Sequence, residues 1–340
     1  MPTANRILSG CVMIAGLLST PNMATQLTTH PTASSVPRIA FASQRDGNWE
    51  IYTADGDGGR QTRVTKAEPQ DRFPLWSPDG SRIAYGSQAG DRWDLWVINA
   101  DGTNPKILAR DIVAKGHRQW SHDGTRIVFA ADVGGDREIL TVDVASGRLG
   151  RLTTSAGEDA DPSWSPSDSL IVFSSKRSGD GDIFVMRPDG TRQQQLTTND
   201  VPDVSPQWSP DGARIAYISG QVAERDVFVV HARDARVERL TTGAQATSDG
   251  AKWSSSGLYL AVQTSTAGYD IELIRMSDRK RWTLAGTPSY DGQFSWSPAG
   301  ERIAFISARD GVEAVYVADL AGKPTRLTTS PSLNPVWAPQ

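Results

Sequence analysis

The chain of 340 residues has few of the residue types that build disulfides and many metal sites. It contains one cysteine, Cys11, and four histidines. A single cysteine cannot form an internal disulfide, and these residues are too few for a cysteine-rich or multi-histidine metal centre. The formal net charge is −4. Because nucleic-acid binding favours a basic footprint, we expect no nucleic-acid partner.

The composition also excludes disordered and collagen-like chains. Apolar residues make up 38% and charged residues 22% of the sequence, so the chain can bury enough apolar surface to form a core. Glycine does not recur at every third position, as a collagen helix would require. The sequence lacks a Gly-x-Ser-x-Gly nucleophile motif, a Walker loop and a dinucleotide-binding fingerprint. Several large enzyme classes are therefore disfavoured.

The first 24 residues have the pattern of a secretory signal peptide. Arg6 precedes the uncharged and mostly apolar run 7–18, and polar residues follow it. This run is shorter than the roughly 20 residues that span a bilayer. We therefore predict a signal peptide over 1–24, cleaved after Ala24, a linker over 25–36, and a periplasmic or secreted mature chain.

Two alternatives remain for the same segment. It could form a buried N-terminal helix instead of a leader. Leu8-Ser9-Gly10-Cys11 is similar to a bacterial lipoprotein box, which would make Cys11 a lipid anchor and the chain a lipoprotein, although most of the apolar stretch follows this cysteine. Peripheral association with a membrane is thus a further possibility to test.

Tryptophan recurs at a nearly constant spacing along the chain. Seven of the eleven tryptophans follow one another at steps of 41 to 45 residues, namely Trp76, Trp120, Trp164, Trp208, Trp253, Trp296 and Trp337. Most begin a variant of Trp-Ser-Pro-Asp-Gly, in which Pro, Asp and Gly favour a tight turn. A period of about 40 to 45 residues with four strands is typical of a β-propeller blade.

Each period contains short strand-like segments between turn clusters. Arg214-Ile215-Ala216-Tyr217 follows one tryptophan turn, and Arg239-Leu240-Thr241-Thr242 comes later in the same period. β-Branched and aromatic residues between turn clusters favour antiparallel strands. No segment after the leader shows a helical period, so we predict an all-β fold. The repeated tryptophans are expected to pack between neighbouring blades, because stacked sheets need bulky side chains between them.

The two ends of the chain indicate how the propeller closes. The repeats begin near Arg38-Ile39-Ala40-Phe41, a second strand, and finish at Asn334-Pro335-Val336-Trp337, a first strand. We therefore predict a seven-bladed propeller of four-stranded antiparallel blades over 37–340, with the last blade closed by strands from both termini. An open solenoid is the alternative, but it would need polar caps that neither end provides.

A carboxylate precedes the third strand of six of the seven blades. These residues are Glu50, Asp94, Glu138, Asp182, Asp226 and Asp270, spaced 44 residues apart, and Ala314 takes the place in the remaining blade. Six symmetric copies argue against one catalytic site. We expect them to hold each blade together, with the arginines that head the second strands as candidate partners (Arg82, Arg126, Arg214 and Arg302).

The pattern Arg-Leu-Thr, Pro-x-Trp-Ser-Pro-Asp-Gly, Arg-Ile-Ala-Phe resembles the TolB-like family of WD40-like propeller repeats. Clear copies include Arg151-Leu152-Thr153 and Pro206-Gln207-Trp208-Ser209-Pro210-Asp211-Gly212. The resemblance covers about residues 38–340. It implies a propeller related to a periplasmic protein that binds partner proteins, and also to the propellers of some peptidases and sugar-acid lyases. The seven blades differ from the six of the family's namesake, and there is no room for the namesake's separate N-terminal α/β domain.

The resemblance also implies that the first strand of each blade is innermost and faces a central channel. Its leading residues would then form a channel mouth. The candidate binding residues there are Asp71, His117, Asp159, Asp161, Asp203, Asp249, Asp291 and Asn334. A ring of carboxylates would attract a cation or a basic partner segment, and its oxygens suit Ca²⁺ or Mg²⁺ more than Zn²⁺. Alternatively, these Asp residues only bond loop backbone.

These features give three hypotheses for function. The first is a secreted or periplasmic, non-catalytic propeller that binds an envelope or secreted protein or peptide and is expected to be a monomer. The second is a carbohydrate lyase or hydrolase with metal-assisted chemistry at His117 and Asp161. The third is a purely structural module. His122, which replaces the proline of one tryptophan turn, is the weaker of the two histidine candidates.

Overall fold

The computed structural model describes residues 37–112, 117–266, 268–284, 286 and 289–339. The described residues all fall within one compact unit. The predicted signal peptide, Cys11 and the predicted linker lie outside the described residues. Every regular element of the described part is a β-strand, as the repeat pattern predicts.

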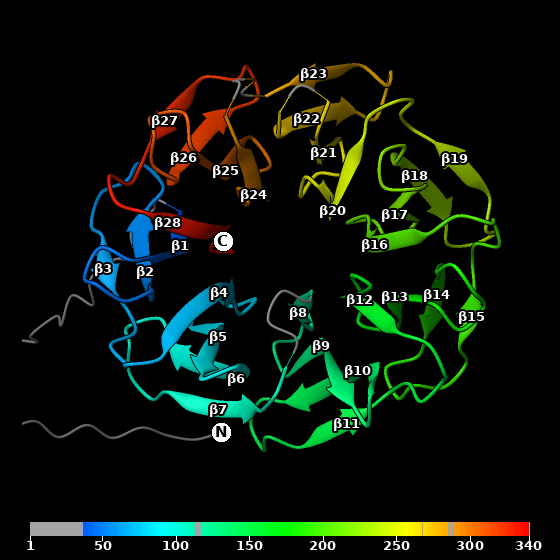
Figure 1. The fold of residues 1–340 in the computed structure, drawn as a ribbon, viewed down its shortest axis with the longest axis horizontal. Coiled ribbons are helices and arrows are strands. Elements are labelled where there is room, and N and C mark those ends of the chain that lie inside the picture. Colours follow the sequence, from blue (N-terminus) through cyan, green and yellow to red (C-terminus); the bar gives the residue numbers. More distant parts are fainter. Residues whose placement is uncertain (1–36, 113–116, 267, 285, 287–288, 340) are drawn as a thin grey trace, which may run out of the picture. The chain divides into compact units, whose positions relative to one another are not determined.

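Seven four-stranded antiparallel sheets are arranged around a common centre (Figure 1). In each, the strand that ends at a repeated tryptophan lies innermost, as the family resemblance implies. These inner strands are β4 (Gln70–Trp76), β8 (Arg118–Trp120), β12 (Asp159–Trp164), β16 (Asp203–Trp208), β20 (Ala246–Trp253), β24 (Asp291–Trp296) and β28 (Ser332–Trp337).

The second and third strands of each blade carry most of its buried apolar residues. The second strands are β1 (Arg38–Ser43), β5 (Arg82–Ala89), β9 (Arg126–Val133), β13 (Ile171–Ser175), β17 (Arg214–Ser219), β21 (Tyr259–Thr264) and β25 (Arg302–Ser307). The third strands are β2 (Glu50–Asp55), β6 (Arg92–Asn99), β10 (Asp136–Asp143), β14 (Asp182–Met186), β18 (Asp226–His231), β22 (Asp270–Arg275) and β26 (Ala314–Asp319). Buried on both faces, these strands are nearly continuous apolar runs instead of alternating ones.

The outermost strands are short and mostly exposed. They are β3 (Thr62–Arg63), β7 (Lys106–Ala109), β11 (Leu149–Arg151), β15 (Gln194–Gln195), β19 (Val237–Arg239), β23 (Arg281–Thr283) and β27 (Pro324–Arg326). Short, charged edge strands limit the pairing of one chain with another.

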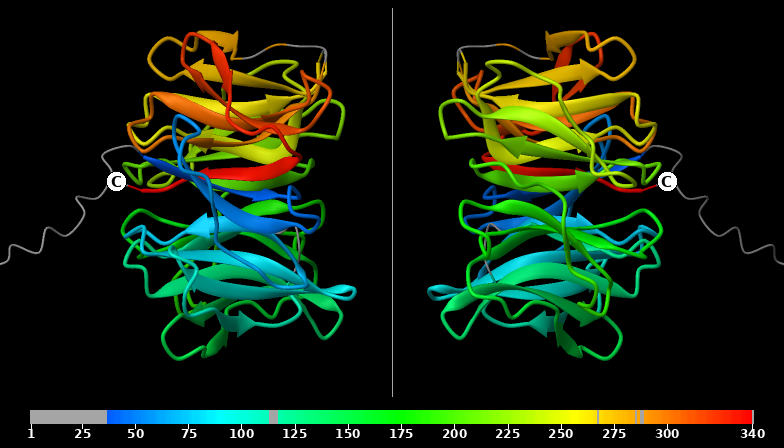
Figure 2. Two further views of the ribbon diagram at one scale, coloured as in Figure 1. Left: turned by 90° about the vertical axis from the view of Figure 1, so that its left-hand side faces the viewer. Right: turned by 90° about the vertical axis from the view of Figure 1, so that its right-hand side faces the viewer.

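The predicted closure by both termini is confirmed. The sheet order β28-β1-β2-β3 joins the last strand of the chain to the first three. Ile39 pairs with Trp337 and Ala40 with Val336. The side views show the blue β1 strand beside the red β28 strand (Figure 2). The final blade therefore depends on residues almost 300 positions apart in the sequence.

The repeated tryptophans lie between blades, as predicted. Trp120 Nε1 donates a hydrogen bond to Leu75 O of the preceding inner strand at 3.2 Å, and Trp296 Nε1 donates to Lys252 O at 2.8 Å. An arginine from the preceding blade covers several of these rings; the Arg126 guanidinium, for example, lies 4.7 Å from the centre of the Trp164 ring. The repeated tryptophans thus fill the interfaces by packing, and Trp76, Trp120, Trp253 and Trp296 add a hydrogen bond across the boundary.

Five of the six recurring carboxylates, all except Asp270, form hydrogen bonds with described residues of their own blades, but the expected arginine partners were wrong. Glu138 binds Arg151 at 2.6 Å and Thr153 at 2.5 Å, both from the end of its own blade. The second-strand arginines such as Arg126 stack on tryptophan rings instead. The spacing predicted the recurring carboxylates correctly; however, several repeats carry a second arginine in the outer strand, and the periodicity alone does not distinguish the two arginines.

Candidate functional site

The inner strands carry an irregularity three residues before the tryptophan. Five residues at this position adopt positive φ angles between 47° and 59°, namely Phe73, Asp161, Ser205, Gln293 and Asn334, and Gly250 does so at 81°. The pairing of these strands shifts register at the same place. A left-handed residue interrupts the alternation of side chains. It turns this position out of the sheet and toward the neighbouring blades.

Four of these residues form two pairs that are hydrogen-bonded across blade boundaries. Asp161 accepts from the backbone N of Ser205 at 3.1 Å and from its hydroxyl at 3.2 Å. Gln293 Oε1 accepts from the backbone N of Asn334 at 2.9 Å. His117 Nδ1 lies 3.5 Å from Asp161 Oδ1. The residues form a partial ring in which one blade contacts the next.

Three cavities follow the inner strands. The first has a volume of about 470 Å³, and its lining includes Phe73, His117, Asp249, Gln293 and Asn334. The second, of about 350 Å³, shares His117 and Asp249 with it. The third, of about 600 Å³, is lined by repeated tryptophans and the prolines of their turns. We use the term channel for the three together, and mouth for the end formed by the first. Volumes of this size suit a small ligand or a short peptide segment.

Four of the eight predicted site residues are buried inside blades, away from the described lining of these three cavities. Asp71, Asp159, Asp203 and Asp291 are each at most 1% exposed. Each pairs with a serine of the second strand; Asp159, for example, is the register partner of Ser175. The predicted ring of carboxylates at the mouth is therefore not assembled. Asp159 and Asp291 bind arginine side chains of their own blades, and not the loop backbone that the alternative from the sequence named.

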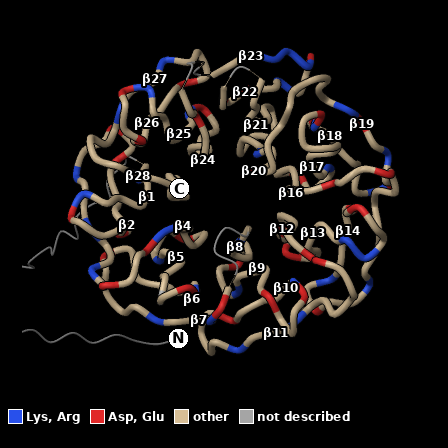
Figure 3. Tube along the Cα trace, viewed as in Figure 1, with Lys and Arg blue, Asp and Glu red and all other residues tan. Residues whose placement is uncertain are grey.

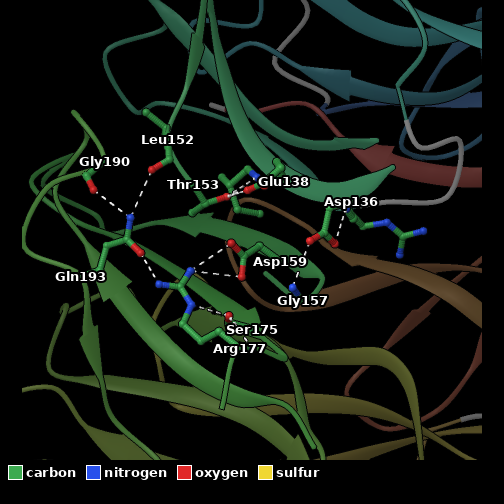
Figure 4. Close-up of polar contacts among 12 residues, drawn as sticks. Asp136, Glu138, Leu152, Thr153, Gly157, Asp159, Ser175, Arg177, Gly190 and Gln193 are labelled. Atoms are coloured by element: carbon green, nitrogen blue, oxygen red, sulfur yellow. Dashed lines mark hydrogen bonds and ion pairs between the residues drawn. The ribbon is translucent and has the colours of Figure 1, made fainter. Parts of the chain in front are cut away.

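Asp159 shows how such a carboxylate is held (Figure 4). Its two oxygens accept from Arg177 Nη2 at 3.2 and 3.0 Å, and the same guanidinium binds Ser175 and Gln193. Asp291 and Arg309 repeat this arrangement in another blade. A fully buried carboxylate is tolerated because a bidentate guanidinium compensates for its lost hydration.

Asp71 lacks this compensation. Ala89 stands where the other two blades have Arg177 and Arg309, two residues after the paired serine. The hydroxyls of Ser87 and Thr65 face the Asp71 carboxylate, but neither carboxylate oxygen has a hydrogen-bond partner of good geometry among the described residues. Burial raises the pKa of Asp71 to about 7, and the hydroxyls of Ser87 and Thr65 oppose this rise only in part.

The other four predicted residues lie at or beside the mouth. His117, Asp249 and Asn334 line its cavity, and Asp161 is next to His117. Asn334 Oδ1 is buried without a hydrogen-bond partner among the described residues, whereas its Nδ2 donates to Gln293 at 3.1 Å. His122, by contrast, lies in an exposed turn and contacts Asp168 at 2.9 Å.

Sequence reasoning missed two cations of the channel wall, Arg118 and Lys252. Both line the first and second cavities. Desolvation lowers the pKa of Arg118 to about 10 and also lowers the pKa of Lys252, although the charge of Asp249 opposes the change at Lys252. A signal was present in the repeats, because the residues equivalent to these two in the other six blades are uncharged.

The described residues do not bring together three or more His, Cys, Asp or Glu side chains that could hold a metal ion. The proposed Ca²⁺ or Mg²⁺ site at the mouth therefore has no ligand set of that kind there, and we assign it no chemistry. Over the same part of the chain, no helix is long and apolar enough to cross a membrane.

Fold and geometry together define a closed propeller with a lined axial channel, and the sequence comparison gives its family. The profile of the TolB beta propeller domain matches residues 111–248 and 185–340. The chain thus belongs to the TolB beta propeller domain family. A search of curated proteins found no match.

Solved structures with this fold include TolB and several enzymes. TolB from Acinetobacter baumannii is 18% identical, with a TM-score of 0.58, over 89% of this chain and 67% of that one. Oligogalacturonate lyase from Vibrio parahaemolyticus is 15% identical, with a TM-score of 0.68, over 83% and 86%. A puromycin-hydrolysing peptidase from Mycobacterium tuberculosis is 15% identical, with a TM-score of 0.63, over 78% and 46%. At these identities the likeness is one of fold.

Proposed function

We propose that the chain is a periplasmic or secreted binding propeller that holds a protein or peptide segment at the mouth of its channel. The observation that carries this proposal is the mouth cavity of about 470 Å³. The polar residues that line this cavity lie on or next to the inner strands. Packing and hydrogen bonds between blades hold these strands in place. Binding residues on a rigid scaffold are the usual arrangement of a recognition site.

Two further features support this proposal. Residues 1–24 have the pattern of a secretory signal peptide, which favours export. The cluster around His117 contains Asp161 and Ser205. The Ser205 hydroxyl, however, contacts the Asp161 carboxylate and the backbone oxygen of Ser248. The histidine is thus not placed as a base on that hydroxyl, as nucleophilic catalysis requires.

A capture experiment from an envelope extract tests the proposal. The immobilised chain should retain a defined partner, and purified partner should then bind directly. Gln293→Ala and Asn334→Ala should each weaken this binding about tenfold, since both remove polar groups from the mouth. Glu301→Ala, an exposed residue in a tryptophan-side turn, serves as the matched control. Equal binding by all three variants would contradict a site at the mouth.

Export is tested separately. A fusion carrying residues 1–24 before a periplasm-dependent reporter should be active, and deletion of 7–18 should abolish its activity because the apolar run is then lost. A cysteine-to-serine change at Cys11 separates the two kinds of leader. Unchanged processing favours simple cleavage, whereas loss of membrane attachment would establish the lipoprotein alternative.

The second candidate function is a carbohydrate lyase or hydrolase. It is favoured by the lyase from Vibrio parahaemolyticus, of which this chain covers 86%. The test is metal analysis of the purified chain followed by a panel of acidic oligosaccharides and small esters. Stoichiometric metal together with turnover that His117→Ala abolishes would replace the binding proposal.

A further inference from the structure

The charges of the channel wall are unlike those expected from the sequence. The buried Asp residues belong to the blades, and the charged groups that the first two cavities share are Arg118, Lys252, Asp249 and the titratable His117. Two cations therefore face one carboxylate among the described lining residues. Figure 3 shows Lys and Arg positions spread over the outer strands of the ring and few on the strands around its centre. The two cations of the channel are thus a departure from the general distribution.

Both cations also break the repeat. The residue before the tryptophan is uncharged in six blades (Leu75, Gln119, Ser163, Gln207, Ser295 and Val336) and is Lys252 in the seventh. The residue two before it is Pro74, Pro162, Pro206, Ala251, Phe294 or Pro335 in six blades, and Arg118 in the remaining one. A residue required by the fold recurs with the period, as the tryptophans do. A charged residue that occurs in only one blade, at a channel position, therefore indicates a role other than stabilising the fold.

Lys252 is held in the wall but is not neutralised there. Its Nζ donates to Phe294 O at 2.6 Å and lies 4.7 Å from the centre of the Phe294 ring. Within the described part of the chain it forms no ion pair. An ammonium group has three donors, so capacity to donate remains after this bond. Taking such a charge out of bulk water is costly unless a counter-charge is supplied.

We infer that the channel binds a carboxylate group of the partner's peptide segment, with Lys252 as its counter-charge and Arg118 as the second cation of the same cavity. This inference rests on the proposed function and specifies the chemistry of its partner. The described lining has an excess of one positive charge, which a singly charged carboxylate would balance. A doubly charged phosphate would instead leave one negative charge unbalanced. Arg118 already lies 5.4 Å from the Phe73 ring centre, so Lys252 is the principal contact.

The lowered pKa of Lys252 agrees with this arrangement. Desolvation disfavours the ammonium form, and a bound carboxylate would favour it again. Binding and protonation of Lys252 are therefore coupled, so affinity should decline at alkaline pH as the ammonium loses its proton. His117 and Asp249 face the same cavity.

The test uses short blocked peptides with random flanking residues and a fixed central Asp or Asn. The full chain should retain the Asp pool about tenfold more strongly than the Asn pool. Lys252→Met keeps the length of the side chain and should abolish this preference, whereas Lys252→Arg should keep most of it. Lys280→Met, at an exposed outer turn, is the control. Equal melting temperatures of the variants exclude misfolding as the cause.

Each other outcome overturns a stated part of the inference. Equal retention of both pools, or a preference that persists in Lys252→Met, removes Lys252 as the counter-charge. Lys252-dependent binding of free galacturonate without the peptide preference assigns the carboxylate to a sugar and overturns the peptide. Lys252-dependent binding of inorganic phosphate overturns the carboxylate. Capture of the envelope partner is measured in parallel with Lys252→Met. If that capture persists at full strength, the inference fails while the proposed function stands.

Discussion

Individual side chains in this propeller carry different tasks at equivalent positions of the repeat. Asp71, Asp159 and Asp291 occupy the same place in three blades, but an arginine binds only the last two. In the blade that contains β1, the arginine is present and the carboxylate is absent. Arg45 follows Ser43 as Arg177 follows Ser175, and Ser332 takes the place of the carboxylate. The repeat therefore tolerates the loss of either partner, with different physical consequences.

Asp71→Asn should make stability less dependent on pH. The folded state raises the pKa of Asp71 from 3.8 to about 7, so it disfavours ionisation. The free energy of unfolding of the natural chain should accordingly fall as pH rises from about 4 to about 7. One pKa unit corresponds to about 1.4 kcal/mol, which allows a difference of up to about 4 kcal/mol. Chemical denaturation at both ends of this range measures it.

The variant should match the natural chain at acidic pH and exceed its stability at pH 8. Asp159→Asn is the matched comparison, because Arg177 compensates for the charge of that carboxylate. It should be destabilised at pH 8. An Asp71→Asn variant that is less stable at pH 8 than the natural chain would show that the ionised carboxylate contributes favourable contacts, contrary to this account.

At the level of strands, the buried ion pair between β12 and the turn after β13 should be essential to its blade. Arg177→Met leaves the Asp159 carboxylate fully buried without its guanidinium. Loss of one partner of such a pair costs about 3 to 5 kcal/mol. Arg45→Met removes a guanidinium that binds Ser43 and Gln61 but no carboxylate within the described residues. It should cost about 1 kcal/mol.

Equilibrium unfolding of both variants and of the double variant Arg177→Met/Asp159→Asn measures these differences. The double variant should recover part of the loss, because it no longer buries an unpaired charge. Equal losses for Arg45→Met and Arg177→Met would mean that the stacking of the guanidinium on aromatic rings, common to both, and not the ion pair, is what stabilises the blade.

Strands and blades could be predicted well from the sequence, because periodicity reports on them directly. The tryptophan ladder predicts the number of blades, their order and the closure, since a repeated contact requires a repeated residue. The orientation of side chains at the channel could not be predicted in the same way. Asp161 takes a left-handed conformation that turns it out of the sheet, whereas Asp159, two residues earlier, points into the blade. That difference arises from the irregularity in pairing, which leaves no distinct signature in the pattern.

The channel residues that the sequence reasoning missed are those that do not repeat. Lys252 and Arg118 are visible only as departures from otherwise uncharged positions. A search for recurring carboxylates instead selected Asp71, Asp159, Asp203 and Asp291, whose recurrence reflects the blade. In a repeat fold, periodic residues thus report on stability, and residues that break the period are better candidates for binding.

At the scale of the ring, closure should determine cooperativity. Deletion of 332–340 removes β28, leaving the inner edge of β1 unpaired and Trp76 Nε1 without Val336 O, which it now binds at 3.2 Å. We expect a lower melting temperature and a broader unfolding transition, because an unpaired inner edge exposes apolar surface. Calorimetry measures both quantities. A synthetic peptide of residues 332–340 should restore the transition, and an unaltered transition in the truncated chain would contradict closure by β28.

The whole account depends on binding inside the channel and not on the outer surface of the ring. Leu75 borders all three cavities, so Leu75→Trp should fill the channel without changing any charge. Leu149→Trp adds the same side chain at an exposed position of β11. The decisive measurement is the dissociation constant of the captured partner for both variants, at matched melting temperatures. We predict at least about a tenfold weakening for Leu75→Trp and none for Leu149→Trp. Equal affinities would place the partner elsewhere and contradict the account.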